Sequence, residues 1–363
     1  MKRLGIIALA ASVLIVLASC KKEKEPEKKV VVDIESITIT PTKANMQRGE
    51  TLELNVTVTP EGASVNDIVW TTENERVATV SNGVITAVGY GVTNIFATAG
   101  VVQSKVKVSV AEPERKYTLI WQDEFNGTSV DESLWSYQIG SNVNNEKQYY
   151  KKENATISDG YLVITAKKED ITDSHGTVWH YTSSRLHSKK SQTYGKIEAR
   201  ISWPAGKGSW PAFWMMPVDN KYGRWPYSGE IDIVEHWGRE PSVVSYAVHT
   251  KLKNGNGKPS GNWGYKIYED GIEGSFHTYG IEWIENGYNG NGYIEFYFDG
   301  KLKASVAQSD WQTGSWEDWP FDQNFYSILN LAVGGNLGGA IDDGAFPMVM
   351  KVDWVRAYKI DYK

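Results

Sequence analysis

Three carboxylates in one short stretch of this sequence could do chemistry together. The stretch GEIDIVEHWG, residues 229–238, sets Glu230, Asp232 and Glu235 among apolar and aromatic residues. In a regular strand, side chains alternate between faces, so Glu230 and Asp232 share one face while Glu235 points to the other. In a helix, which turns about 100° per residue, Glu235 lies roughly 140° around the axis from Glu230. A shared site therefore requires a break in regular geometry.

The chemistry that such a trio suits is the hydrolysis of glycosidic bonds. Retaining enzymes of this class use two carboxyl groups about 5–5.5 Å apart, one as nucleophile and one as acid/base. Glu230 and Glu235 are long enough to converge, and Asp232 between them could hydrogen-bond one of them and set its ionisation. A calcium site is an alternative, because three oxygen ligands could hold a hard cation. An exposed polar strand face is another, although adjacent like charges without a lysine are destabilising.

Tryptophans are concentrated around these acids. The sequence has fifteen Trp, and five of them fall within 35 residues around the acidic stretch: Trp203, Trp210, Trp214, Trp225 and Trp237. Flat aromatic faces suit the C–H faces of sugar rings, and nearby polar groups can bind the hydroxyls. A single Trp is more simply explained by core packing, but five around three carboxylates favour a carbohydrate cleft.

The elements that must position these residues are predicted to be strands. Over residues 116–363, alternating runs recur, and in YIEFYFDGK the residues Ile294, Phe296 and Phe298 face one way, before an Asp299-Gly300 hairpin turn. No run supports a long amphipathic helix. The pattern predicts two large packed antiparallel sheets.

An earlier module, over residues 31–111, is also predicted to be all β. Leu52, Leu54, Val56 and Val58 alternate with polar residues, as in a half-buried strand, and Asn82-Gly83 is a turn signal. The residues GETLELNVTVTPEGAS and VWTTENERVATVSNGVITAVGYGVTNI resemble bacterial Ig-like domains of group 2. The resemblance implies an Ig-like β-sandwich and is compatible with a role in spacing or adhesion. The module shows no convergent polar cluster, which favours a spacer, and residues 111–115 are predicted to be the linker.

The N-terminus is typical of a secreted lipoprotein. Lys2 and Arg3 precede the apolar run 4–17, which is shorter than the roughly 20 residues that a membrane span needs. The run ends in LASC, which resembles a bacterial lipobox with cleavage before Cys20. Cys20 is the only cysteine, so no intramolecular disulfide can form.

We therefore predict a lipoprotein signal peptide over residues 1–19, a lipid anchor on Cys20 and a charged tether over residues 20–30. The expected location is a bacterial membrane, the outer membrane facing the cell surface or the periplasm. Without residues 1–19 the chain has 36 basic and 44 acidic residues, a net charge of −8. No domain is strongly basic, so no nucleic-acid partner is expected, and six scattered histidines argue against a catalytic zinc site. We expect a monomer.

The second module resembles glycoside hydrolase family 16, in its laminarinase-like branch. The string EIDIVE carries the resemblance, with WPAFWMMP before it and FYSILNLAVGGNLGG after it, and supporting stretches such as WQDEFNG and KVDWVRAY lie at the two ends of the module. The resemblance covers about residues 117–360. It implies a concanavalin-like β-jelly roll with a cleft on the concave sheet. It also implies hydrolysis of internal β-glycosidic bonds with retention, without a catalytic cofactor.

The resemblance also implies roles for individual residues. Glu230 matches the nucleophile, Glu235 the general acid/base and Asp232 the assisting acid between them. The matching positions for substrate contacts are Asn145, Arg185, Trp210, Trp214 and His249. Many family members bind a structural calcium ion on the convex side, and the matching positions here are Glu124, the carbonyl of Gly160 and Asp353.

The substrate expected from the resemblance is β-1,3- or mixed β-1,3/1,4-glucan. The segments 251–266 and 309–320 would border the cleft, and they do not match a β-1,3-glucan specialist closely enough to decide the linkage. Two alternatives stay open: an endo-β-galactosidase acting on mucin-type or other galactan chains, and a non-catalytic glycan-binding surface protein. Both catalytic glutamates are present, which argues against the binding protein.

The spacing of the three acids then becomes a structural prediction. Relatives with the shorter motif E-x-D-x-E place all three acids on one face by simple alternation. In EIDIVE the extra residue must be absorbed by a β-bulge, in which two residues oppose one on the neighbouring strand. We predict this bulge at Ile233 or Val234, with all three acids on the concave surface.

Overall fold

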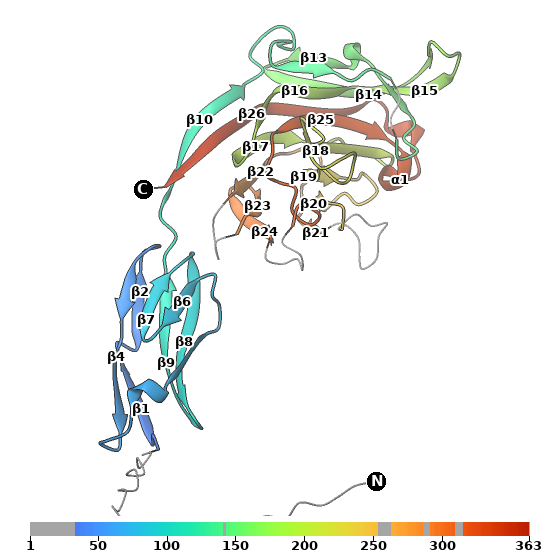
Figure 1. Ribbon diagram of the computed structural model, residues 1–363. Coiled ribbons are helices and arrows are strands. Elements are labelled where there is room, and N and C mark those ends of the chain that lie inside the picture. The colour runs from blue at the N-terminus through green and yellow to red at the C-terminus, as the bar shows by residue number, and fades with distance from the viewer. Residues whose placement is uncertain (1–32, 141–142, 253–262, 286–290, 309–314, 363) are drawn as a thin grey trace, which may run out of the picture.

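The protein consists of two β modules, each with its own hydrophobic core. The computed structural model describes residues 33–140, 143–252, 263–285, 291–308 and 315–362 (Figure 1). None of the helices in those ranges is long and apolar enough to span a membrane. The predicted signal peptide, Cys20 and the tether lie outside the described residues. In Figure 1 the smaller module, in blue, and the larger module lie end to end.

The smaller module is a sandwich of short strands in three sheets. These are β1 (Ser36–Thr40) with β4 (Asn55–Thr59); β2 (Lys43–Met46), β9 (Val102–Val110), β8 (Gly91–Ala99) and β5 (Val69–Thr72); and β3 (Thr51–Glu53), β7 (Val84–Ala87) and β6 (Ala78–Ser81), with a single 3-10 turn, η1 (Val65–Asp67). Alternate residues of these strands, such as Ile85, Ile95, Val106 and Val108, are fully buried in one core. The alternation read from the sequence therefore fills an Ig-like sandwich.

One expectation for this module needs correction. The alternating run from Leu52 to Val58 is not one strand but two, β3 and β4, which belong to different sheets. The change occurs at Leu54, whose N–H donates to the carbonyl of Gly83. Leu54 itself is buried, so the run keeps its apolar residues inward while the chain passes from one sheet to the other.

The two predicted hairpin turns are confirmed. Asn82-Gly83 joins β6 to β7, and both residues have positive φ, 47° and 81°. Asp299-Gly300 joins two strands of the larger module with φ values of 47° and 70°. Positive φ at both central residues is the geometry that Asn-Gly and Asp-Gly pairs adopt most readily.

The larger module has two sheets packed face to face. The ten-stranded sheet has the order β12 (Gln148–Tyr150), β15 (Val178–Ser183), β14 (Tyr161–Thr172), β26 (Met348–Tyr362), β17 (Gly195–Ser202), β22 (Phe276–Ile284), β23 (Tyr293–Phe298) and β24 (Lys301–Ala307), with β10 (Arg115–Asp123) paired to β26 and β13 (Ala155–Ser158) paired to β14. The seven-stranded sheet has the order β11 (Trp135–Tyr137), β16 (Arg185–Gln192), β25 (Phe325–Val333), β18 (Ser209–Pro217), β19 (Glu230–His236), β20 (Val243–His249) and β21 (Trp263–Tyr268).

Helices contribute little to the described residues. Besides η1 of the smaller module, they are α1 (Gly335–Gly338) and the 3-10 turns η2 (Lys152–Asn154) and η4 (Asp343–Ala345). The expectation of an all-β jelly roll without long helices is confirmed.

A single core lies between the two sheets. Phe213 and Met215 of β18 pack there with Ile281 of β22 and Phe296 of β23, all fully buried. Because side chains alternate along each strand, the residues between them face away from the core. We call this side of the seven-stranded sheet its outer face, and it is the face where the predicted site must lie.

The junction between the modules is a charged cluster rather than a free linker. Arg115, predicted to be in the linker, begins β10 of the larger module. Its guanidinium contacts Glu112 at 3.1 Å, Glu295 at 2.6 Å and Glu282. It also donates to the hydroxyl of Tyr293 at 2.6 Å.

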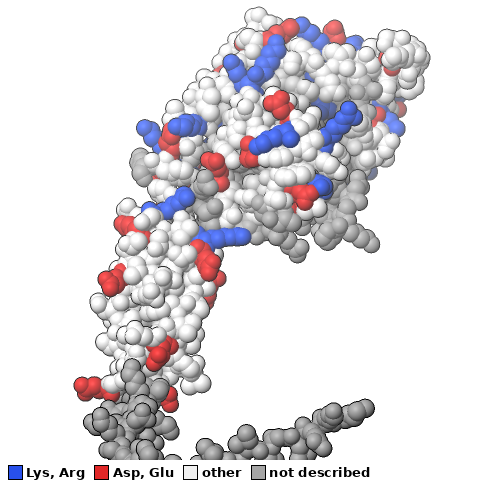
Figure 2. All heavy atoms as spheres, in the orientation of Figure 1, with Lys and Arg blue, Asp and Glu red and all other residues white. Residues whose placement is uncertain are grey.

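Elsewhere, Figure 2 shows acidic and basic side chains interspersed on the face in view, without a broad patch of one sign.

Candidate active site

The three acids lie on β19, an inner strand of the seven-stranded sheet between β18 and β20. Ile231, Ile233 and Val234 are fully buried in the core between the sheets. Glu230 and Glu235 are partly exposed. The strand therefore has a continuous apolar side and an acidic side, although its sequence does not alternate regularly.

A β-bulge reconciles these two sides. Against β20, Asp232 pairs with Ala247 and Glu235 pairs with Ser245, so Ile233 and Val234 together oppose a single residue, Tyr246. The register against β18 shifts over the same part of the strand. Two residues opposing one is the defining feature of a bulge. The bulge predicted at Ile233 or Val234 is confirmed.

The bulge brings the three acids to the outer face. Carboxylate oxygens of Glu230 and Asp232 and a ring nitrogen of His249 lie within 4.8 Å of one another. Burial raises the pKa of Glu235, and the negative charge of Glu230 raises it further. The backbone thus places the acids as the resemblance implied.

Glu235 is held by a tryptophan of the neighbouring strand. The indole N–H of Trp210 on β18 donates to Oε1 of Glu235 at 2.8 Å. Trp210 in turn packs against Trp237, Val243 and Ala332 in a small separate apolar cluster. Burial raises the pKa of Glu235 to about 7, against the opposing effects of the Trp210 hydrogen bond and the positive charge of His249. Near neutral pH this carboxyl can therefore both donate and accept a proton.

His249 supplies the positive charge of the site. It is the residue of β20 that pairs with Glu230, and its Nε2 lies 3.0 Å from Asp232 Oδ2 and 3.8 Å from Glu230 Oε1. Burial lowers the pKa of His249, but the hydrogen bond to Asp232 and the neighbouring carboxylates outweigh it and raise the pKa to about 9. The imidazole is therefore protonated at neutral pH.

Glu230 accepts a hydrogen bond from a second tryptophan. The indole N–H of Trp225 donates to Oε2 of Glu230 at 2.5 Å. Burial raises the pKa of Glu230, as does the charge of Asp232, while His249 and the Trp225 hydrogen bond lower it. Burial also raises the pKa of Asp232. The imidazolium and the indole thus oppose the protonation of Glu230 that burial and the charge of Asp232 favour.

Glu230, Asp232 and His249 are also the one set of described residues whose acidic and imidazole groups could hold a metal ion. The raised pKa of His249 argues for a different role. A protonated imidazole carries hydrogens on both ring nitrogens and has no lone pair for a metal. The set is better described as an ion pair that balances part of the negative charge of the acids.

Arg185 and Trp214 lie on the same outer face, across the sheet from the acids. Arg185 pairs with Asn330 of β25. Asn330 pairs in turn with Ala212 of β18, and Ala212 pairs with Glu235 of β19, so Arg185 and Glu235 lie in one row across the sheet. The guanidinium of Arg185 lies 4.5 Å from the ring centroid of Trp214. Its Nε is buried and donates to none of the described residues. These two residues form one side of the site.

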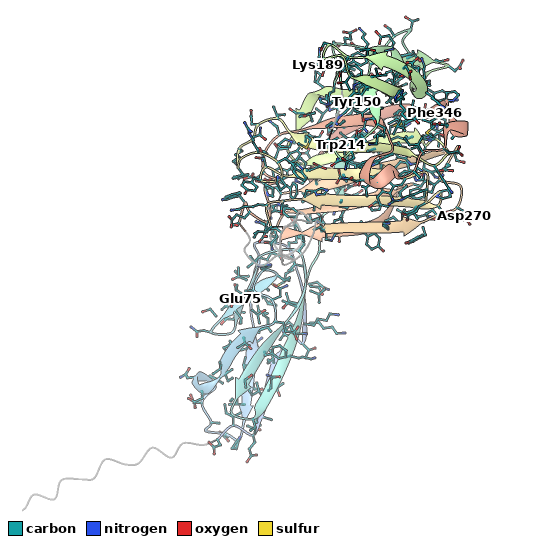
Figure 3. All side chains as sticks on the ribbon, turned by 90° about the vertical axis from the view of Figure 1, so that its right-hand side faces the viewer. Glu75, Tyr150, Lys189, Trp214, Asp270 and Phe346 are labelled. Carbon is teal, nitrogen blue, oxygen red and sulfur yellow. The ribbon has the colours of Figure 1, made fainter. Side chains whose placement is uncertain are left out.

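Two residues that sequence reasoning missed support Trp214. Asn330 accepts a hydrogen bond from the indole of Trp214 at 2.7 Å, and its own amide donates to the hydroxyl of Tyr150 at 3.2 Å. Figure 3 labels Trp214 and Tyr150 in the larger module. Asn330 could have been found as a single polar residue inside the apolar run FYSILNLAV. Tyr150 carried no comparable signal.

Asn145 forms its hydrogen bond away from the acids. It is exposed, and its amide donates to Asn336 of α1 at 2.8 Å. The structure therefore places Asn145 beside α1 and shows no bond from it to the acids or to Arg185. Its predicted contact with sugar stays a prediction.

The predicted calcium residues are engaged in ion pairs. Both oxygens of Glu124 accept from Arg356, at 2.7 and 2.8 Å, and Asp353 accepts from Arg200 at 2.5 Å. Gly160 lies in a turn with φ of 78°. Since a calcium ion would have to displace Arg356 from Glu124, these residues as arranged do not fit the predicted ion.

Comparisons with known proteins match both modules. A family model described as "Beta-porphyranase A-D, GH16 domain" matches residues 120–360, and a model of the bacterial Ig-like domain (group 2) matches residues 33–110. The first match covers more than half of the chain. The chain belongs to glycoside hydrolase family 16. Its resemblance to that family and to the Ig-like domains, read from the motifs, is confirmed.

Individual relatives of this glycoside hydrolase differ in the polymer that their names give. This chain is 38% identical over 265 residues to a beta-glucanase of Rhodothermus marinus, and the match covers 67% of this chain and 85% of the relative. It is 34% identical over 247 residues to a keratan-sulfate endo-1,4-beta-galactosidase of Sphingobacterium multivorum, covering 67% of this chain and 56% of the relative. The solved laminarinase of Rhodothermus marinus matches with a TM-score of 0.62 and 38% identity, over 68% of this chain and 99% of that one.

The bond between Trp210 and Glu235 predicts a specific change in pH dependence. Protonated Glu235 is the form that can donate a proton, so kcat/KM should fall as the pH rises through about 7. Trp210→Phe keeps an aromatic ring but removes the N–H that lowers the pKa of Glu235. We expect the alkaline limb of the kcat/KM profile to move to higher pH.

The matched control is Trp237→Phe. Trp237 packs in the same cluster, but its buried indole N–H donates to none of the described residues. The alkaline limb of the kcat/KM profile of Trp237→Phe should stay at the wild-type position. Equal shifts in both variants, or none in Trp210→Phe, would show that the hydrogen bond does not set the ionisation of Glu235.

Proposed function

We propose that this glycoside hydrolase is a retaining endo-β-glucanase that cuts internal bonds of β-1,3- or mixed β-1,3/1,4-glucan by double displacement. The observation that carries the proposal is the bulge at Ile233 and Val234, which puts Glu230 and Glu235 on one face with different partners. The relatives named beta-glucanase and laminarinase support the glucan substrate.

In the first step Glu230 is the nucleophile and Glu235 the general acid. The carboxylate of Glu230 forms a bond to the anomeric carbon as Glu235 protonates the departing glycosidic oxygen. The pKa of Glu235, raised to about 7 by burial, lets it hold that proton near neutral pH. Protonated His249 and the Trp225 N–H stabilise the ionised Glu230 before attack.

In the second step the glycosyl–enzyme bond is hydrolysed. Ionised Glu235 takes a proton from water, the water oxygen bonds to the anomeric carbon, and Glu230 leaves as a carboxylate. Asp232 keeps His249 in place through their 3.0 Å contact, and its negative charge adds to burial in raising the pKa of Glu230. Two carboxyl groups and water suffice for this reaction, and no cofactor takes part. The calcium ion expected at Glu124 is not part of this proposal.

The sugar rings would lie along the outer face of the seven-stranded sheet. Trp210 and Trp214, on alternate positions of β18, supply aromatic surface beside the acids. Arg185 lies 4.5 Å from the ring centroid of Trp214, and its buried Nε has no partner among the described residues. Aromatic faces for sugar C–H groups and a few placed polar groups are what a glycan site needs.

A second candidate is an endo-β-galactosidase on galactan chains. The family model described as beta-porphyranase and the relative named keratan-sulfate endo-1,4-beta-galactosidase favour it. The relatives named beta-glucanase and laminarinase favour the glucan instead. A non-catalytic binding role would not explain two interacting glutamates with raised pKa values.

We infer that the enzyme is a monomer, attached to a bacterial membrane by lipid on Cys20, in the outer membrane facing the surface or the periplasm. The support is the sequence LASC after a short apolar run, followed by the charged tether. Cys20→Ser should abolish incorporation of labelled palmitate and move the protein out of the membrane fraction. Retention of the variant in the membrane with no label would show that the anchor is something else.

Removing either glutamate should separate their roles. Glu230→Gln should lower release of reducing sugar from laminarin to below about a thousandth of wild type, since the nucleophile is lost. Glu235→Ala should cost about 10²–10⁴-fold on laminarin. On a substrate with a good leaving group, azide should restore turnover of Glu235→Ala, because azide attacks the glycosyl–enzyme without a base. The product should be a β-glycosyl azide.

Glu240→Gln is the matched control for these variants. Glu240 lies just beyond β19, paired with Lys266 at 3.2 Å, and its loss should leave activity near wild type. Parent-rate hydrolysis by Glu230→Gln, or no azide rescue of Glu235→Ala, would contradict the assigned roles.

The substrate preference is tested by comparing the products released from five polymers in parallel. Laminarin, barley-type mixed-linkage glucan, agarose, porphyran and mucin glycans are incubated with the enzyme, and the released oligosaccharides are separated. We expect short β-glucan oligosaccharides from the first two polymers. Products only from the galactans or the mucin glycans would replace the glucanase with the endo-β-galactosidase.

A further inference from the structure

A group of exposed aromatic side chains lies beside the acids, and Trp225 is the member that contacts one of them. Trp225 and Tyr227 precede β19, and Trp316 precedes β25. Their residues are 47%, 42% and 36% exposed, respectively. Together with Tyr222 and Lys251, which pack against them, we call them the aromatic patch.

The patch is continuous with the catalytic acids. Trp225 both donates to Glu230 and lies beside His249, with their ring centroids 5.9 Å apart. Lys251 follows His249 by two residues, and its ammonium lies 5.4 Å from the ring centroid of Tyr227 and 5.1 Å from that of Trp316. A chain bound at the acids could therefore extend over the patch without leaving the protein surface.

The patch is held in place by a second layer of contacts. The rings of Tyr222 and Trp316 stack at 5.1 Å with an angle of 5° between their planes. The hydroxyl of Tyr222 donates to Asp322, and Ser228 Oγ accepts from the backbone N–H of Tyr222 at 3.0 Å. Gln323 donates to the carbonyl of Ser228 at 3.1 Å. Rings fixed before binding lose less entropy when a ligand arrives.

Its charges are paired within the patch. Lys251 forms an ion pair with Glu317, and Lys221 forms one with Asp322 at 2.9 Å. The exposed surface is thus mainly aromatic, with polar groups already satisfied at its margin. Such a surface suits the apolar faces of uncharged sugar rings better than it suits an ionic partner.

We propose that the aromatic patch binds further sugar units of the same polysaccharide chain, beyond the two units joined by the bond that is cut. The proposal rests on the function proposed above and deepens it, because it makes the enzyme prefer long uncharged chains to short ones. The patch acts on affinity, whereas Glu230 and Glu235 act on the bond.

The test compares a long and a short substrate. Trp316→Ala and, separately, Tyr227→Ala are assayed on laminarin and on laminaritriose. Loss of one stacked ring should lower kcat/KM on laminarin about 3- to 10-fold, mainly through KM, and change it less than twofold on laminaritriose. Tyr227→Ala is a second, independent variant, so that misfolding of one variant does not decide the result; the residue is 42% exposed and its ring contacts Lys251.

Tyr268→Ala is the control. Tyr268 is 72% exposed on β21 of the same sheet, and it pairs with Val243 at the end of β20 opposite His249. This variant should match wild type on both substrates. The proposal would be overturned if both patch variants lost kcat/KM equally on the two substrates, or if neither lost it on laminarin. A wild-type enzyme that cuts neither substrate would contradict the glucanase function instead, and the same comparison would then use a long and a short galactan.

Discussion

The burial of Ile233 and Val234 is the constraint on which the active site depends. Both side chains are fully buried between the two sheets. Burying an aliphatic side chain of this size contributes about 1.5–3 kcal/mol. Consecutive residues of a regular strand cannot both face the core, so the strand must bulge, and the bulge returns Glu235 to the side of Glu230. Apolar packing thus holds together carboxylates that would otherwise repel one another.

The site tolerates this crowding because each acid has a different partner. Glu235 accepts from Trp210, Glu230 accepts from Trp225, and Asp232 faces His249. The partners come from the two strands beside β19 and from the segment before it, so the sheet register decides which acid meets which group. Burial raises the pKa of each acid, and the imidazolium of His249 limits the rise in the pKa of Glu230. Two glutamates on one strand can in this way serve as nucleophile and acid.

Other parts of the molecule border this site and join it to the smaller module. The aromatic patch extends the surface on the side of Glu230, and Arg185 with Trp214 extends it on the side of β25. At the other end of the larger module, Arg115 joins Glu112 to Glu282 and Glu295. These contacts tie the segment after the Ig-like module to the catalytic sheets, which suits a spacer that presents the enzyme to a polymer.

The amino-acid sequence by itself determined the two β modules, the acidic trio, the tryptophans around it and the need for a bulge. Those conclusions follow from local rules: side chains alternate along strands, Asn-Gly and Asp-Gly form tight hairpins, and an extra residue must be absorbed somewhere. Only the tertiary structure decided that the chain passes from one sheet to another at Leu54 and that Arg115 belongs to the larger module. It also decided that Arg356 forms an ion pair with Glu124. It also decided that His249 stands opposite Glu230 and that Trp225, Asn330 and Tyr150 support the site. These contacts join residues distant in the chain, and their pairing depends on strand order and register, which spacing along one sequence does not contain.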